Sequence, residues 1–147
     1  MASRTIRPLC DDDVAAVVGL WARAGLTRPW NDPHRDIALA RATPHADVLV
    51  LAEAGGLAGA VMVGHDGHRG TVYYLGVEPA LTGTGRGRAL MSAAEDWLRA
   101  HGVWKINLLV RDGNAATLGF YEALGYGDQA CRVMGKRLDG RADRTPP

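Results

Sequence analysis

A glycine-rich turn in the middle of the chain constrains this sequence more than any other feature. Three alternating glycines, Gly83, Gly85 and Gly87, lie between a strand-like run and a long amphipathic segment. Since glycine has no Cβ atom, the backbone there can adopt positive φ angles and a ligand can approach it closely. The N–H groups of such a turn and of the helix behind it suit a phosphate, and Arg86 and Arg88 add positive charge. A simple connection, in which the glycines only turn and cap, is the alternative.

The residues before this turn predict two helices and an antiparallel meander. Asp11-Asp12-Asp13 should cap the first helix, Gly25 should end it, and Gly55-Gly56 between two apolar runs indicates a hairpin. We expect the following elements in this part of the chain: strand 5–8, helix 14–23, helix 33–42, strand 47–54, strand 57–65 and strand 71–77.

After the turn the pattern changes to helices alternating with strands. We expect helix 87–101, strand 105–110, helix 115–124 with Asn114 as its N-cap, and strand 129–137, followed by a disordered polar tail over 139–147. The strands 71–77 and 105–110 would be parallel and joined by a right-handed crossover helix. The sequence therefore predicts an α/β fold with a mixed sheet, in a single domain over residues 1–138.

Composition argues against several classes of partner. The 17 Lys and Arg residues nearly balance the 16 Asp and Glu residues, which gives no sign of a nucleic-acid or membrane partner. The longest apolar runs, 48–52 and 57–63, are too short to span a membrane, and we expect no secretory signal. Cys10 and Cys131 are expected to be reduced thiols in a cytoplasmic protein, and no metal site is expected.

Two common phosphate-binding patterns do not fit the turn. A P-loop needs Lys followed by Ser or Thr after its last glycine, whereas Gly87 is followed by Arg88-Ala89. A dinucleotide fingerprint has Gly-x-Gly-x-x-Gly spacing in the first strand–helix unit, whereas this turn has Gly-x-Gly-x-Gly in mid-chain. The sequence therefore favours neither of these nucleotide sites.

Two motifs, in order along the chain, resemble those of the GNAT (Gcn5-related) N-acetyltransferases. The pyrophosphate loop of that family, Gln/Arg-x-x-Gly-x-Gly/Ala, corresponds to residues 82–87 and is preceded by Val77-Glu78-Pro79. The family's Asn-x6-Tyr-x3-Gly-aromatic signature corresponds to residues 114–126. The resemblance covers nearly the whole chain, and residues 28–33 and 66–70 are similar to the bacterial YpeA-like acetyltransferases.

The resemblance implies acetyl-CoA as the cosubstrate. Its pantetheine arm would lie between two splayed strands and pair with the main chain of Leu75 and Val77, where a bulge at Gly76 would free those groups. Thr82 stands where the family usually has Gln or Arg, yet its hydroxyl can still donate a hydrogen bond. The cofactor-binding residues that the resemblance implies are Leu75, Gly76, Val77, Thr82, Gly83, Thr84, Gly85, Arg86, Gly87, Arg88, Asn114 and Tyr121.

The resemblance further implies direct transfer of the acetyl group to an amine. A backbone N–H near Val77 would stabilise the oxyanion, and Tyr121 would protonate the departing sulfur as general acid. Tyr121 follows Asn114 by seven residues, about two helical turns, so both can face one side of a helix. The general base is not implied, because Leu109 stands where related enzymes that acetylate protein N-termini have Glu. Candidates for the base are Glu53, Asp66 and Asp112.

The expected acceptor is a primary amine, on a small molecule, a peptide or protein N-terminus, or a lysine. The loop 28–33 falls where the family builds its acceptor pocket, so a cationic amine could lie against Trp30, Asn31 and Asp32, with Asp66 as a further candidate. A proline-fixed turn with Trp30 packed inward is the alternative. The second hypothesis for the whole chain is a non-catalytic acyl-CoA-binding sensor. We expect a monomer or a homodimer.

Overall fold

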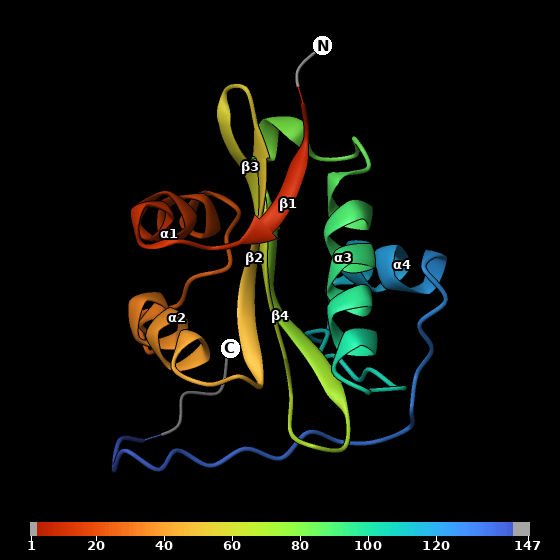
Figure 1. Cartoon of the computed structure of the whole chain (residues 1–147). Coiled ribbons are helices and arrows are strands. Elements are labelled where there is room, and N and C mark those ends of the chain that lie inside the picture. The colour runs from red at the N-terminus through yellow and green to blue at the C-terminus, as the bar shows by residue number, and fades with distance from the viewer. Residues whose placement is uncertain (1–2, 143–147) are drawn as a thin grey trace. The chain divides into compact units, whose positions relative to one another are not determined.

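The computed structural model describes residues 3–142 and falls into two compact units, residues 1–109 and residues 110–147 (Figure 1). The first unit holds a sheet and helices α1 (Val14–Arg23), α2 (Pro33–Arg41) and α3 (Arg86–Ala100), and the second holds helix α4 (Ala115–Ala123). Of the tail that was expected to be disordered, residues 143–147 lie outside the described residues.

The first unit is built on a four-stranded antiparallel sheet with the strand order β1-β2-β3-β4. Its strands are β1 (Thr5–Pro8), β2 (Ala46–Glu53), β3 (Gly56–His65) and β4 (Gly70–Val77). The predicted meander is confirmed. The turn of the β2–β3 hairpin consists of Ala54 and Gly55, one residue earlier than predicted, because Glu53 already pairs with Gly56.

Helices cover both faces of this sheet: α1 and α2 lie on one face, and α3 lies on the other (Figure 1). The central strand β2 is therefore buried on both faces from Val48 to Leu51. The helices present apolar residues at helical spacing, namely Val17, Leu20 and Trp21 from α1 and Leu90, Met91, Ala94 and Leu98 from α3. Trp21 is fully buried, and a side chain of this size contributes about 3–5 kcal/mol to folding when it is compared with alanine.

Helix α1 ends as predicted. Gly25 has a φ of 76°, which turns the chain out of the helix. The N–H of Leu26 then donates to the Trp21 carbonyl at 2.9 Å, and the N–H of Gly25 donates to the Ala22 carbonyl at 3.1 Å. The beginning of the helix differs from the prediction. Asp13 occupies the N-cap position, but its side chain makes no capping hydrogen bond to α1.

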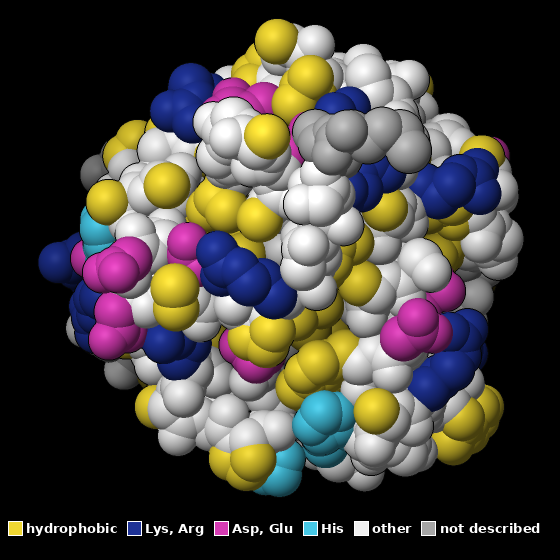
Figure 2. Space-filling model, turned by 45° about the horizontal axis from the view of Figure 1, so that its top comes forward, with side chains coloured by type: hydrophobic (Ala, Val, Ile, Leu, Met, Phe, Trp, Pro, Cys, Tyr) yellow, Lys and Arg dark blue, Asp and Glu magenta, His cyan; other side chains and the backbone are white. Residues whose placement is uncertain are grey.

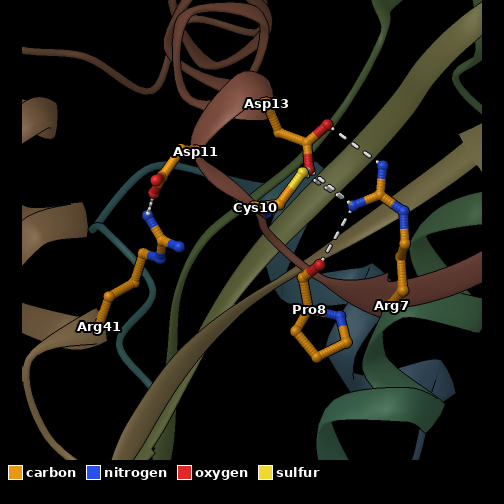
Figure 3. Close-up of polar contacts among 6 residues, drawn as sticks. All are labelled: Arg7, Pro8, Cys10, Asp11, Asp13 and Arg41. Atoms are coloured by element: carbon orange, nitrogen blue, oxygen red, sulfur yellow. Dashed lines mark hydrogen bonds and ion pairs between the residues drawn. The ribbon is translucent and has the colours of Figure 1, made fainter.

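The Asp13 carboxylate instead joins β1 to the short 3-10 helix η1 (Asp11–Asp13), as Figure 3 shows. Its Oδ2 accepts from Nη1 of Arg7 at 2.6 Å and from the backbone N–H of Cys10 at 2.9 Å, and its Oδ1 accepts from Nη2 of Arg7 at 3.2 Å. The hydrogen bond with Arg7 holds the pKa of Asp13 well below its usual range. Arg41 of α2 binds Asp11 at 2.7 Å, so both helices of this face are tied to η1.

The predicted strand 105–110 is wrong as an element, although its parallel start is confirmed. A single parallel bridge joins Gly70 to Ile106: Gly70 N–H donates to the Lys105 carbonyl and Asn107 N–H donates to the Gly70 carbonyl, both at 2.9 Å. Beyond the bridge, β4 contains a bulge at Tyr74 and Leu75, with Tyr74 at a φ of 55°. A bulge bends its strand, so a straight neighbour cannot follow it.

In the second unit, helix α4 confirms the prediction at both ends. The Asn114 side chain caps it by accepting from the Thr117 N–H at 3.2 Å, and Gly125, with a φ of 94°, ends it. The predicted strand 129–137 is wrong, since residues 129–137 have no strand structure. Ala130 has a φ of 54° and its N–H donates to the Asp128 carboxylate at 2.7 Å, which turns the chain out of an extended path.

Figure 2 shows acidic and basic side chains interspersed over the face that it presents, in line with the balanced composition. Within residues 3–142 no helix has the length and apolar character needed to cross a membrane. Cys10 and Cys131 are both free and exposed.

Candidate functional site

The glycine turn links the end of β4 to the start of α3 through a short 3-10 helix, η2 (Pro79–Leu81). Gly83 and Gly85 have φ angles of 79° and 83°, and a Cβ atom added to either would meet nothing within 4 Å. The Thr84 hydroxyl donates to the Leu81 carbonyl and holds the turn in place, while Thr82 is exposed. The backbone of the turn is therefore open to solvent on the side of its glycines.

The start of α3 leaves four backbone donors free. The first N–H that donates to the helix is that of Ala89, which reaches the Gly85 carbonyl at 3.1 Å. Within the described residues, the N–H groups from Gly85 to Arg88 donate to no carbonyl or side chain. Together with the dipole of a 15-residue helix, these groups form a site that favours a negatively charged group.

The two arginines of the turn differ in what surrounds them. Arg86 binds the Glu53 carboxylate through two hydrogen bonds, from Nε to Oε1 at 2.7 Å and from Nη2 to Oε2 at 2.9 Å. Its charge is therefore neutralised inside the first unit, which the sequence did not indicate. Arg88 is exposed and forms no ion pair with any residue of the described range. The sequence grouped the two arginines together, and the structure separates them.

The turn is anchored at its other end by Glu78, which follows β4 directly. Arg23 at the end of α1 binds both oxygens of Glu78, with Nε to Oε2 at 3.2 Å. This contact holds the pKa of Glu78 below its usual value. Ion pairs with Arg23 and with Glu53 therefore fix the two ends of the turn, while the glycines between them remain open.

The bulge expected at Gly76 of β4 is present but lies directly before that residue. It comprises Tyr74 and Leu75, because Met62 pairs with Tyr73 and Ala60 with Gly76. Gly76 is a packing glycine instead: a Cβ there would lie 2.9 Å from Leu26 and 3.0 Å from Trp21. The sequence could not show this, because the side chains that require a glycine come from α1 and the residues just after it. On the other edge of β4, pairing with 105–109 is limited to the bridge at Gly70.

The predicted acceptor loop brings together only part of its predicted set. The Asp32 side chain caps α2 by accepting from the His34 N–H at 2.9 Å, and Trp30 is half-buried. Asn31 instead joins two residues that the sequence did not single out, Asp36 of α2 and Tyr74 of the bulge. Their only sequence signals are that Asp36 follows Asp32 by one helical turn and that Tyr74 directly precedes Leu75-Gly76-Val77.

Two of the candidate bases already accept hydrogen bonds from fixed neighbours. The hydrogen bonds from Arg86 lower the pKa of Glu53, so this carboxylate is a poor proton acceptor. Asp66 closes the β3–β4 turn by accepting from the N–H groups of His68 and Arg69, both at 2.8 Å, and these bonds lower its pKa. Asp112 is exposed in the second unit, as is Leu109 at the end of the first.

Tyr121 lies on α4 and is buried, with ring contacts to Phe120 and Tyr126. Burial raises the pKa of its hydroxyl to about 12, so the group remains protonated at neutral pH. The roles of Tyr121 and Asn114 at the cofactor stay predictions. Within residues 3–142 no group of three or more His, Cys, Asp or Glu side chains is placed to hold a metal ion.

Comparison with known proteins gives a consistent result. The model of the acetyltransferase (GNAT) family matches residues 15–126. A protein of Pectobacterium atrosepticum named acetyltransferase is 48% identical over 135 residues, which is 90% of this chain and 94% of that protein. These matches favour an enzyme over a non-catalytic sensor.

Solved structures show the same fold. The ribosomal-protein-S18-alanine N-acetyltransferase from Escherichia coli is similar with a TM-score of 0.72 and 28% identity, over 84% of this chain and 77% of that one. The structure of AAC(6')-Iy in complex with the bisubstrate analogue CoA-S-monomethyl-acetylneamine is similar with a TM-score of 0.79 and 15% identity, over 92% and 98% of the two chains.

Proposed function

This chain belongs to the acetyltransferase (GNAT) family and is an acyltransferase, and we propose that it moves the acetyl group of acetyl-CoA directly to a primary amine. The observation that supports this most strongly is the row of four free N–H groups from Gly85 to Arg88, at the start of a long helix and beside two open glycines. A diphosphate offers the negative charge and the acceptor oxygens that such a row requires.

The residues of the turn fit the diphosphate of coenzyme A. Hydrogen bonds from backbone N–H to a charged oxygen are worth about 1.5–3 kcal/mol each. Arg88 supplies a positive charge that no described residue neutralises, whereas Arg86 serves to hold the turn through Glu53. Thr82 stands where the family usually has Gln or Arg, but this difference should affect cofactor binding little, because the main chain provides most of the hydrogen-bond donors.

The pantetheine arm is proposed to lie along the unpaired edge of β4. Pairing with the segment 105–109 stops at the bridge at Gly70, and the bulge at Tyr74 and Leu75 interrupts the strand shortly before its end. Unpaired main-chain groups on a strand edge can hydrogen-bond an extended ligand, and the amide-rich pantetheine arm has matching donors and acceptors.

The proposed reaction is a single transfer. An acceptor bound as an ammonium first loses one proton to solvent, and the neutral nitrogen then attacks the thioester carbonyl carbon. The carbon–sulfur bond breaks, the nitrogen loses its second proton to solvent, and Tyr121 donates its hydroxyl proton to the departing thiolate and regains one from solvent. A pKa raised to about 12 by burial keeps Tyr121 protonated until the sulfur leaves. The solved relatives support an amine acceptor, since one is named for the alanine of a ribosomal protein and another holds a CoA-linked neamine analogue.

Cofactor binding is tested by thermal unfolding with and without acetyl-CoA. At about 100 times its dissociation constant the ligand should add about 2.7 kcal/mol to the free energy of unfolding. Release of free thiol with a panel of amines then tests transfer. An upward shift with NADH or ATP, and none with acetyl-CoA, would contradict the proposal.

The role of Tyr121 is tested by Tyr121→Phe, with Tyr73→Phe as the matched control because Tyr73 is 47% exposed on the first unit. We expect Tyr121→Phe to lower kcat about ten- to a thousand-fold while the dissociation constant of acetyl-CoA stays unchanged. Equal rates for the two variants would remove Tyr121 as the acid.

A further inference from the structure

Three side chains from separate segments form a closed ring of hydrogen bonds beside the bulge of β4. The Asn31 amide donates to Oδ2 of Asp36 at 2.8 Å and to the hydroxyl of Tyr74 at 2.7 Å. The Tyr74 hydroxyl in turn donates to the same Oδ2 of Asp36 at 2.7 Å. We call this set, Asn31, Asp36 and Tyr74, the amide–carboxylate–phenol cluster.

The ring uses every hydrogen-bond donor of the cluster. An Asn amide has two N–H donors, a Tyr hydroxyl has one, and an ionised Asp has none. The orientation of the Asn31 amide is fixed, because its oxygen is an acceptor and cannot hydrogen-bond the Asp36 carboxylate, which has no donor. The cluster can therefore only accept hydrogen bonds from a further group. Its main acceptors are Oδ1 of Asn31 and Oδ1 of Asp36, which accept from no residue of the described range.

The charge of the cluster is not balanced by a cation. Within residues 3–142 Asp36 forms no ion pair. Arg35, which precedes it on α2, makes none with it, and Arg28 donates instead to the carbonyls of Gly25 and Thr27. Burial first, and then the hydrogen bond to Asp36, raise the pKa of Tyr74, with the charge of Asp32 acting in the same direction. Tyr74 thus stays neutral, and the net charge of the cluster is that of one carboxylate.

Tyr74 is held rigidly at the point where β4 approaches the expected thioester. Its ring stacks on that of Trp21, with 4.3 Å between the ring centroids and 16° between the ring planes. Its φ of 55° is unfavourable for a residue with a Cβ atom, and such strain persists only where the surroundings fix the residue. The next residues are Leu75 to Val77, which the proposed function places beside pantetheine.

Resting on the proposed function, we propose that this cluster binds the acceptor amine as a cation and so selects alkylammonium acceptors over uncharged arylamines. An ammonium has three N–H donors and no acceptor, which is the complement of a cluster that has acceptors left and one negative charge. Asp36 supplies the charge, Asn31 supplies a second acceptor, and Tyr74 fixes Asp36 at the bulge. Asp36 and Tyr74 are thus specificity-determining residues.

The test measures thiol release from saturating acetyl-CoA with two alkylammonium acceptors, spermidine and a tripeptide with a free N-terminus, and with aniline. Asp36→Asn should raise KM for both alkylammonium acceptors about 10- to 100-fold, since one charged hydrogen-bond partner is lost. Its rate with aniline and its dissociation constant for acetyl-CoA should stay within twofold of wild type. Asp12→Asn, an exposed aspartate of η1, is the matched control and should change none of these values.

A second variant covers the case in which Asp36→Asn does not fold. Tyr74→Phe keeps the ring stacked on Trp21 and removes two hydrogen bonds, the one to Asp36 and the one from Asn31, and it should raise KM for spermidine about three- to tenfold. An unchanged KM in the variant that folds, or an equal loss with aniline, overturns the assignment of the cluster. Turnover of aniline but not of spermidine by the wild type also overturns it while leaving the acetyltransferase intact. The proposed function itself fails if acetyl-CoA does not shift unfolding, or if no amine, aniline included, releases thiol from it.

Discussion

Asp13 and Asp36 both join the helical layer of α1 and α2 to the sheet, yet their surroundings differ. Both carboxylate oxygens of Asp13 accept hydrogen bonds from the Arg7 guanidinium, and one also accepts from the Cys10 N–H (Figure 3). Its charge and its acceptor sites are therefore satisfied. Asp36 accepts only from neutral donors, those of Asn31 and Tyr74. A carboxylate paired with Arg7 stabilises the fold, whereas one without a cation remains available to a charged ligand.

The same difference recurs at the glycine turn. Arg86 is paired with Glu53 and fixes the start of α3, whereas Arg88 and the N–H groups around it have no described partner. The first unit therefore has free hydrogen-bond donors at the glycine turn and free hydrogen-bond acceptors at the amide–carboxylate–phenol cluster. In the proposed reaction these two places serve the anionic cosubstrate and the cationic acceptor.

The largest expected effect concerns the paired aspartate. Asp13→Asn should lower the free energy of unfolding by about 1–3 kcal/mol, because Arg7 loses its charged partner. Asp36→Asn should lower it by less than about 1 kcal/mol, since only neutral donors face that group. Urea unfolding of the two variants measures both values. Equal losses would remove the distinction between a structural and a ligand-binding carboxylate.

Acid should abolish the contribution of Asp13 in a defined direction. The pKa of Asp13 is lowered in the folded state by Arg7, so its stabilisation is complete above the unfolded value of about 3.9 and is lost as the pH falls below it. The stability difference between wild type and Asp13→Asn should be constant from pH 7 to 5 and should shrink below about pH 4. A difference that grows on acidification would contradict this.

Glycines at the two ends of α3 allow a matched comparison of the cofactor turn. Gly85 and Gly102 have φ angles of 83° and 80°, and neither is crowded, so alanine at either position costs about 1–2 kcal/mol of backbone strain. Gly85→Ala should weaken acetyl-CoA binding about tenfold or more, whereas Gly102→Ala should only lower thermal stability. Calorimetric titration with acetyl-CoA separates the two, and a similar dissociation constant for both variants would count against a diphosphate on the turn.

The smallest expected effect separates the two arginines. Arg88→Ala should raise the dissociation constant of acetyl-CoA about two- to fivefold at low salt and less at high salt, because Arg88 is an exposed charge near a helix start. Arg86→Ala should instead lower the melting temperature of the free protein, since Glu53 loses its two hydrogen bonds with Arg86 and keeps only the longer ion pair with Arg4 at 3.5 Å. A result in which Arg86→Ala loses more acetyl-CoA binding at low salt than Arg88→Ala does, with no change in melting temperature, would contradict the roles given to the two arginines.

Local elements were predictable from local residues. The hairpin, the end of α1 at Gly25 and the cap at Asn114 each depend on hydrogen bonds between neighbours in the sequence, so turn and cap residues suffice to place them. The strands 105–110 and 129–137 were predicted from the same kind of pattern and are wrong as elements. A strand requires a ladder with another strand, and apolar alternation does not reveal whether a partner is within reach.

The sequence by itself determined the order of helices and strands from β1 to α3, the position of the open glycine turn and the family, because each depends on short spacings. Only the tertiary structure decided which charges are paired, why residue 76 must be glycine and that Asp36 meets Tyr74. These outcomes depend on contacts between residues that are tens of positions apart, 33 for Arg86 with Glu53 and 38 for Tyr74 with Asp36. Pairing across such distances follows from the packing of helices on the sheet.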